Sequence, residues 1–122
     1  MYEIKEDSNM NDFSWFDSVS AALTVCDRDG IIIAMNEKAG ISFAKDGGKA
    51  MIGKSLMNCH NPHSQAMIKE MMNTGKVNAY SIEKKGIKKM IYQAPWYKDG
   101  IICGLVEISM EIPFEMPHFV RE

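Results

Sequence analysis

The sequence predicts a small α+β domain in which helices cover one face of a five-stranded antiparallel sheet. Its 122 residues suit one domain and leave no room for two. Two β-rich runs flank a tight Asp-Gly turn near the start, and three further runs follow one another without a helix near the end. Because short turns join consecutive strands, the sheet is antiparallel, and the helices between the two groups of strands pack on it.

A short helix and a β-hairpin open the domain. Apolar residues at near-helical spacing after Asp12 predict a helix over 13–19. β-rich runs at 21–27 and 31–35 predict two strands, with the sequence DRDG between them. An Asp-Gly pair between such runs is a strong hairpin signal, so these two strands are expected to pair with each other.

Two capped helices separate the hairpin from the last strands. Asn36 is expected to cap a helix that runs to Phe43, and one or two helical turns are expected within 49–60. A longer helix over 61–74 begins with an Asn-Pro pair, in which asparagine is the cap and proline takes the first helical position. Gly75 ends this helix. Its methionine-rich apolar stripe has the spacing of one buried helix face.

Three strands complete the domain. β-rich runs predict strands at 77–83, 88–97 and 101–112, and the two turns between them each end in glycine.

The chain divides into a flexible N-terminus (1–11), a single domain (12–112) and a proline-containing tail (113–122). Prolines at 113 and 117 prevent the tail from continuing as a helix. A free-standing protein or a terminal module is therefore expected.

Composition and charge argue against several functional classes. The net charge of −2 comes with scattered basic residues, which argues against nucleic acid or an anionic membrane as the main partner. No apolar run approaches the ~18 residues of a membrane span, and no secretory signal opens the chain. Three cysteines without a C-x-x-C pair make a disulfide framework or a zinc ribbon unexpected and favour the cytoplasm.

No enzyme activity is expected. The chain lacks catalytic motifs such as G-x-S-x-G and H-E-x-x-H, and it has no phosphate-binding glycine loop. The acidic side chains of the predicted helices and strands are expected on solvated faces: Glu37, Glu70, Glu83, Glu107 and Glu111.

Four short motifs, in this order and spacing, resemble those of a PAS domain, a small sensory module of signalling proteins. They are VCDRDGII at 25–32, MNEKA at 35–39, MIGKS at 51–55, and GLVEI at 104–108 after Gly100. The resemblance spans roughly 12–112. Within that family, NCHNPHS at 58–64 is similar to a Cys-His-Pro-Pro-x-Ser stretch of some PAS domains from anaerobic bacteria, with Asn61 in place of the first proline.

The resemblance implies a cavity between the sheet and the 61–74 helix, where PAS domains hold a haem, a flavin or a small metabolite, or only side chains. Haem is the leading cofactor candidate, with His60 as the candidate iron ligand. A flavin is less favoured, because the photosensor branch needs a reactive cysteine in Gly-x-Asn-Cys and this chain has GKSL at 53–56. The candidate ligand-binding residues are His60, Cys59, Met67, Met71, Tyr80 and Tyr92.

The candidates near the start of the long helix also have a purely structural interpretation. Cys59 can be a small buried side chain and His60 a hydrogen-bonding partner of the loop, with His63 in solvent. These three side chains are too few for a structural zinc site, which needs four ligands. A histidine inside the long helix, the usual haem ligand of such domains, is replaced by Ala66, Met67 and Ile68.

Other candidate residues leave open whether the cavity is filled. Met35, Met51, Met57 and Met90 either line an adaptable pocket or pack in the core; an empty volume of roughly several hundred Å³ would distinguish the two. Strand alternation alone does not decide whether Tyr80, Tyr92 and Gln93 point into the cavity or to solvent. Cys26 and Cys103 are either a redox pair or two free cysteines.

Two functional hypotheses follow. The first is a sensory module that binds a haem or another small molecule and shifts its exposed sheet or termini. The second is a ligand-free interaction module that forms a homodimer through its N-terminal helix, where the aromatic side chains of Phe13, Trp15 and Phe16 otherwise need cover. In either case a signalling partner protein is possible.

Overall fold

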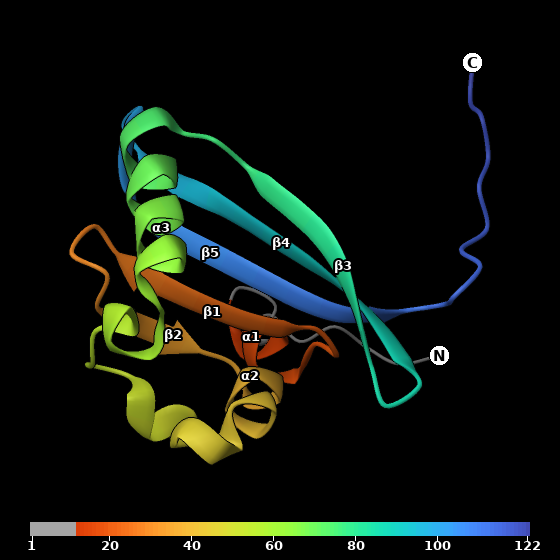
Figure 1. Ribbon diagram of the computed structural model, residues 1–122, viewed down its shortest axis with the longest axis horizontal. Helices are drawn as coiled ribbons and strands as arrows, with labels where there is room; N and C mark the ends of the chain where they lie inside the picture. Colours follow the sequence, from red (N-terminus) through yellow and green to blue (C-terminus); the bar gives the residue numbers. More distant parts are fainter. Residues whose placement is uncertain (1–11) are drawn as a thin grey trace, which may run out of the picture.

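The computed structural model describes residues 12–122, apart from the side chain of Cys59. The expected flexible N-terminus (1–11) lies outside the described residues. A five-stranded antiparallel sheet with the strand order β2-β1-β5-β4-β3 forms the body (Figure 1). Its strands are β1 (Ala22–Asp27), β2 (Ile32–Met35), β3 (Asn78–Lys84), β4 (Ile87–Lys98) and β5 (Ile101–Ile112).

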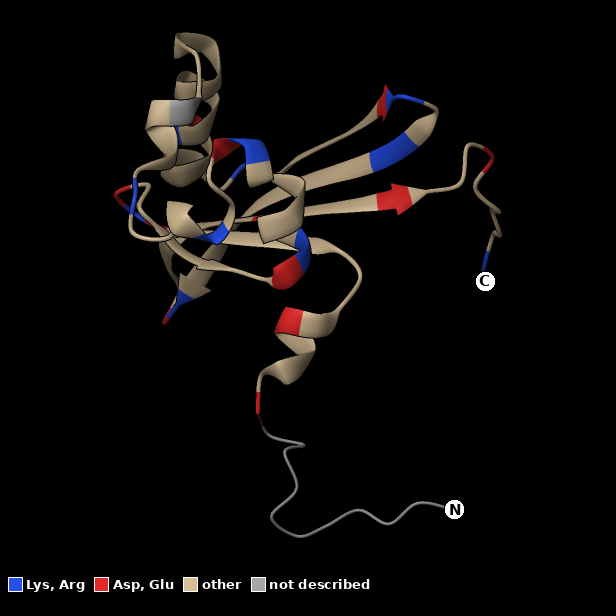
Figure 2. Ribbon diagram, turned by 90° about the horizontal axis from the view of Figure 1, so that it is seen from below, with Lys and Arg blue, Asp and Glu red and all other residues tan. Residues whose placement is uncertain are grey.

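Helical segments connect β2 to β3 across one face of the sheet, as predicted. Figure 1 shows α3 crossing in front of the strands at one end and the shorter segments grouped below it. Figure 2 shows α3 on one side of the sheet and α1 projecting on the other. The helical segments are α1 (Ser14–Ser18), α2 (Glu37–Ser42), α3 (Pro62–Thr74) and the 3-10 turns η2 (Ala44–Asp46), η3 (Gly48–Met51) and η4 (Leu56–Cys59). No helix among residues 12–122 is long and apolar enough to cross a membrane.

The predicted hairpin between β1 and β2 is built around Asp27. Its carboxylate accepts hydrogen bonds from the backbone N–H groups of Asp29 (2.9 Å) and Ile31 (3.0 Å). Gly30 adopts a positive φ of 80°, which glycine permits without steric cost. A side chain that replaces backbone hydrogen bonds in this way is what makes Asp a preferred turn residue.

Asn36 joins β1, β2 and α2. Its side chain is fully buried. The side-chain oxygen accepts from the N–H groups of Leu23 (2.9 Å) and Ala39 (3.0 Å), and its Nδ2 donates to the carbonyl of Ala21 (2.7 Å). The predicted helix cap is therefore also a bridge to the neighbouring strand.

The long helix α3 has the predicted boundaries. The side chain of Asn61 accepts from the N–H of Ser64 at 2.8 Å, and Pro62 occupies the first turn. Gly75 ends the helix in the left-handed conformation. The buried face of α3 consists of Ile68, Met71 and Met72, which pack against the sheet.

A close approach of backbones fixes β5 against β1. A Cβ at Gly104 would overlap the carbonyl oxygen of Cys26 and lie 2.7 Å from Nε1 of Trp96. The Trp96 indole donates to that same carbonyl at 2.9 Å, next to the register shift between Trp96 and Tyr97. Only glycine leaves room for this arrangement.

The buried side chains form two clusters rather than one. The first joins α3 to β1 and β5, and the second joins α2 to β1 and β2. Partly buried Leu56 packs against both clusters.

Replacing Asn36 by alanine tests the bridge between β1, β2 and α2. Asn36→Ala leaves the N–H groups of Leu23 and Ala39 and the carbonyl of Ala21 without their side-chain partner. We expect the free energy of unfolding to fall by about 3 kcal/mol, since each unsatisfied buried group costs about 1–3 kcal/mol. Urea unfolding followed by circular dichroism measures the loss. Asn73→Ala, at an exposed position of α3, is the matched control and should change stability by less than about 0.5 kcal/mol.

Candidate ligand-binding site

A cavity of about 460 Å³ lies between the helical segments and the sheet. Its helical side is largely apolar: Ile68 and Met71 come from α3, Phe43 and Met51 from the segments around η2 and η3, and Leu56 from η4. Its other wall is the inner face of the sheet, that is, the face toward α3. The volume that distinguishes a pocket from a filled core is therefore present.

Polar side chains cross the inner face of the sheet in one row. The registers pair Thr24 of β1 with Glu107 of β5, Glu107 with Gln93 of β4, and Gln93 with Asn78 of β3. Residues paired in this way lie side by side on the same face of a sheet. We call Thr24, Glu107, Gln93 and Asn78 the polar row. Met35 of β2 pairs with Thr24 and completes the row at the sheet edge.

The amides of the polar row are oriented toward Glu107. The Nδ2 of Asn78 donates to Oε1 of Gln93 at 3.0 Å, and Nε2 of Gln93 donates to Oε2 of Glu107 at 2.8 Å. The three side chains thus form a directed chain of hydrogen bonds that ends on a carboxylate. Thr24, Gln93 and Glu107 all line the cavity.

The carboxylate of Glu107 has no cationic partner in the described part of the chain. The ion pairs found there join Lys49 to Asp17 and Lys76 to Glu70, both at the surface. Gln93 is the one side chain among the described residues that donates a hydrogen bond to Glu107. A half-buried negative charge therefore faces the cavity with one oxygen open.

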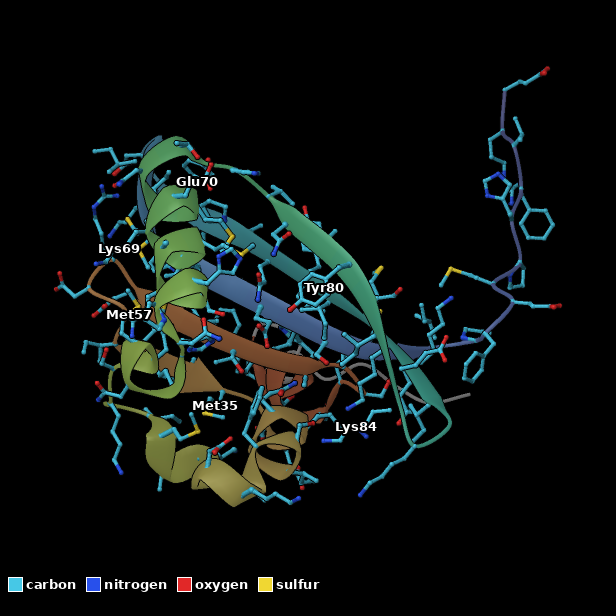
Figure 3. All side chains as sticks on the ribbon, viewed as in Figure 1. Met35, Met57, Lys69, Glu70, Tyr80 and Lys84 are labelled. Carbon is cyan, nitrogen blue, oxygen red and sulfur yellow. The ribbon has the colours of Figure 1, made fainter. Side chains whose placement is uncertain are left out.

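Tyr80 of β3 lines the cavity one row along the sheet from Asn78, and β4 lies between it and Glu107 of β5. Burial is the main reason that its pKa lies above the ordinary value of 10.0, and the negative charge of Glu107 raises the pKa further. The phenol therefore keeps its proton at neutral pH. Figure 3 shows Tyr80 on β3, with Lys84 farther along the same strand.

Two lysines line the cavity at its other end. Lys89 of β4 lies two rows from Gln93 toward the β3–β4 turn, and Lys84 lies at the end of β3. One row corresponds to roughly 7 Å along a strand. The lysines at this end are accompanied by one acid, since Glu111 of β5 pairs with Lys89 on the same face.

Solved structures of PAS domains have the same architecture. The PAS domain of a Colwellia psychrerythraea protein is 21% identical with a TM-score of 0.61, over 81% of this chain and 92% of that one. A sensory box sensor histidine kinase from Vibrio cholerae is 17% identical with a TM-score of 0.59, over 83% and 89% of the two chains. The chain has a PAS fold.

A third similar structure belongs to a haem protein. The Aer2 receptor from Vibrio cholerae, described as a dual PAS-heme oxygen sensor, is 15% identical with a TM-score of 0.55, over 76% of this chain and 95% of that one. No protein-family model matches the chain, and no curated protein matches it significantly. Sequence identities this low show that the PAS fold is shared, and they do not identify a ligand.

Three of the predicted site residues line the cavity of this PAS fold: His60, Met71 and Tyr80. Met71 is buried on α3, whereas His60 is exposed at the rim. The Nδ1 of His60 lies 2.7 Å from the carbonyl oxygen of Leu56 and donates to it, so Nε2 is the nitrogen with a free lone pair. The hydrogen-bonding role that was the structural alternative for His60 is thus present.

The other predicted site residues are placed differently. Tyr92 pairs with Ala79 and Ile108, and therefore lies on the outer face of the sheet, the face away from α3. Tyr80 and Tyr92 belong to opposite phases of the strand alternation, so both cannot face the cavity. Met67 of α3 is not among the cavity-lining residues. The side chain of Cys59 lies outside what the structure describes.

The methionines and the other cysteines divide between core, cavity and surface. Met35 and Met51 line the cavity, whereas Met90 lies on the outer face opposite Ser81. Cys26 is a buried free thiol, and burial is the main reason that its pKa is raised. Cys103 is also free, and its thiol donates to the carbonyl of Ile101.

Sequence reasoning missed the most polar part of the site. Glu107 was expected on a solvated face, but it faces the cavity. The pattern of β5 points the other way, because the positions alternating with Glu107 are apolar: Val106, Ile108, Met110 and Ile112. Only the pairing with Gln93 and Thr24 reveals which face is inner.

Replacing Glu107 tests the electrostatic link to Tyr80. We expect Glu107→Gln to lower the pKa of Tyr80 while leaving it above 10.0, since burial is the larger cause. A raised tyrosine pKa means that the unfolded state loses its proton first, so stability falls as the pH rises above the ordinary value. This alkaline loss should be smaller in Glu107→Gln. NMR of ¹³C-labelled tyrosine measures the pKa. Glu111→Gln changes an exposed acid on the same face of β5 and should leave the pKa unchanged, because Glu107 is the charge that raises it.

Proposed function

We propose that this chain is a sensory or signalling module that binds a small molecule in the cavity between α3 and the sheet. The observation that carries the proposal is the cavity of about 460 Å³ with an apolar helical wall and the polar row opposite. Ligand sites typically combine apolar walls with a few convergent polar groups in this way. The PAS fold shared with a sensor histidine kinase and an oxygen sensor supports the sensory role.

Haem fits this cavity poorly. The planar macrocycle is largely apolar and needs an axial ligand for its iron. Here the sheet side carries the charged carboxylate of Glu107 and the amide of Gln93, and the one histidine is exposed at the rim. A smaller molecule with polar groups of its own satisfies the polar row better. The proposal is a binding module and not an enzyme, acting in the cytoplasm, where Cys26 and Cys103 remain reduced.

A ligand in this cavity contacts the sheet and the helical segments at once. Met71 belongs to α3, Phe43 follows α2, and Glu107 belongs to the central strand β5. Such a ligand changes the equilibrium between two arrangements only if it binds one of them more tightly. Contacts to both walls make the affinity of the ligand depend on the arrangement, because a shift of α3 relative to β5 alters its contacts with each wall.

Blocking the cavity tests the ligand-binding proposal. Ser109 is half-buried, lines the cavity and precedes Met110 on β5, so Ser109→Phe should place a ring in the empty volume. We expect several members of a library of small polar aromatic fragments to shift the backbone amide NMR signals of Met71, Gln93 and Glu107. These shifts should disappear in Ser109→Phe.

The control is Ser81→Phe, an exposed position on the outer face that pairs with Met90. It should retain every fragment that the original chain binds. Fragments that bind Ser109→Phe equally well, or a library without any cavity binder, would contradict the proposal.

A second candidate function is self-association through α1. Phe13 is 74% exposed and Trp15 57% exposed, and their rings lie 6.0 Å apart in one aromatic group with Phe16. The ion pair between Asp17 and Lys49 fixes this short helix to the segment η3. Exposed aromatic groups of this kind are typical of protein–protein contact sites. The partner that we propose is a second copy of the chain.

Truncating Trp15 tests the proposed dimer. We expect Trp15→Ala to weaken self-association roughly tenfold or more, as observed when a large aromatic side chain is lost from the centre of an interface. Sedimentation velocity over a concentration series measures the dissociation constant. Phe119→Ala removes an even more exposed aromatic ring from the tail and should leave the constant unchanged. A dimer that is insensitive to Trp15→Ala excludes this interface.

A further inference from the structure

The hydrogen-bond directions of the polar row define what a ligand must supply. Asn78 donates to Gln93 and Gln93 donates to Glu107, so the amide groups between these residues are already paired with each other. The hydroxyl of Thr24 and the second N–H of Gln93 remain available at the cavity, and the second oxygen of Glu107 is the open acceptor of this row that carries negative charge. A ligand group that meets it has to be a hydrogen-bond donor.

Charge narrows the donor to a cation. Among the described residues no basic side chain forms an ion pair with Glu107, although its carboxylate is half-buried. A neutral donor satisfies the oxygen but leaves the charge without a counterion. A hydroxyl group that donates to the carboxylate already forms a charge-assisted hydrogen bond. A protonated nitrogen adds the attraction between opposite charges, which is stronger at a half-buried site than in bulk water. A protonated nitrogen therefore gains more at this position than a hydroxyl group.

The remaining lining limits the ligand to one positive charge and an apolar body. Opposite the polar row the wall includes Met71, Phe43 and Leu56, and Met35 lies at the β2 end of the row itself. At the other end of the inner face the two lysines, Lys89 and Lys84, outnumber the acid paired with Lys89, Glu111, so this end disfavours a second positive charge. Asp46 is the one acid that lines the cavity from the helical side. Methionine side chains adapt to bodies of different shape.

We propose that the cavity binds a small monoamine, whose protonated nitrogen donates to Glu107 and whose apolar body lies against α3. This inference rests on the proposed function and names the chemical class of its ligand. Tyr80 lines the same cavity from β3, with β4 between it and Glu107.

Matched pairs of amine and alcohol test the proposal. The amines are 3-methylbutylamine, 2-phenylethylamine and tryptamine, each compared at neutral pH with the alcohol of the same carbon skeleton. At least one amine should raise the melting temperature saturably, as a ligand of the folded state does. Its alcohol should bind roughly tenfold to a hundredfold more weakly by calorimetry, because it lacks the attraction between opposite charges at this half-buried site. The diamine 1,5-diaminopentane should bind more weakly than 3-methylbutylamine.

The variant pair Glu107→Gln and Glu111→Gln locates the effect. A glutamine at 107 can still accept the hydrogen bond from Gln93, so the fold is retained and only the charge is lost. The amine should lose its advantage over the alcohol in Glu107→Gln and keep it in Glu111→Gln, which changes an exposed acid on the same strand.

Four results overturn the monoamine assignment: equal binding of amine and alcohol, amine binding that survives Glu107→Gln, tighter binding of the diamine, or no stabilisation by any of the three amines. The fragment experiment with Ser109→Phe separates this failure from failure of the proposed function. If fragments still occupy the cavity, the ligand class is wrong and the binding module remains.

Discussion

The buried side chain of Asn36 is the interaction on which the arrangement of the inner face depends. It caps α2, holds the backbone of β1 at Leu23 and receives no competition from water, because it is fully buried. Met35 precedes it on β2 and Thr24 follows Leu23 on β1, and both line the cavity. One amide therefore sets the positions of the helical wall and of one end of the polar row. A polar side chain is retained at this depth because all of its hydrogen-bonding groups are used.

The central strand β5 connects the proposed ligand site to the rest of the molecule. It lies between β1 and β4. Its side chains alternate between the two faces of the sheet, with Glu107 on the inner face and Val106 and Ile108 on the outer face. Gly104 brings its backbone so close to Cys26 that this end of the strand has little freedom to shift. Glu107 therefore lies on a strand whose position is fixed at one end. A signalling protein needs an element that can adopt only a few positions, because closely packed interiors switch between discrete arrangements.

Local sequence signals predicted the fold well, because each boundary depends on a single side chain acting on its nearest neighbours. Asn36 and Asn61 cap the helices, Gly75 ends α3, and Asp27 organises the first turn. Such local signals do not predict which side chains of a strand lie on the inner face of the sheet. On β5 the more apolar set of side chains lies on the outer face, so hydrophobic alternation favours the wrong face. The cluster around His60 was visible because its members are adjacent in sequence. The polar row was not, since Asn78, Gln93 and Glu107 meet only through strand pairing.

The polar row is a costly feature of so small a core, and its cost is an argument for binding. A half-buried carboxylate without a cation loses hydration that one amide donor replaces only in part. Apolar side chains at these positions would pack against Met71 and Ile68 and enlarge a core that is divided into two clusters. Natural proteins commonly give up stability in this way where a site must be specific for a ligand. A cation that pairs with Glu107 supplies the missing interaction and contacts α3 through its apolar body. Binding therefore joins the two walls that the empty cavity leaves apart, which is the energetic basis that a small sensory module requires.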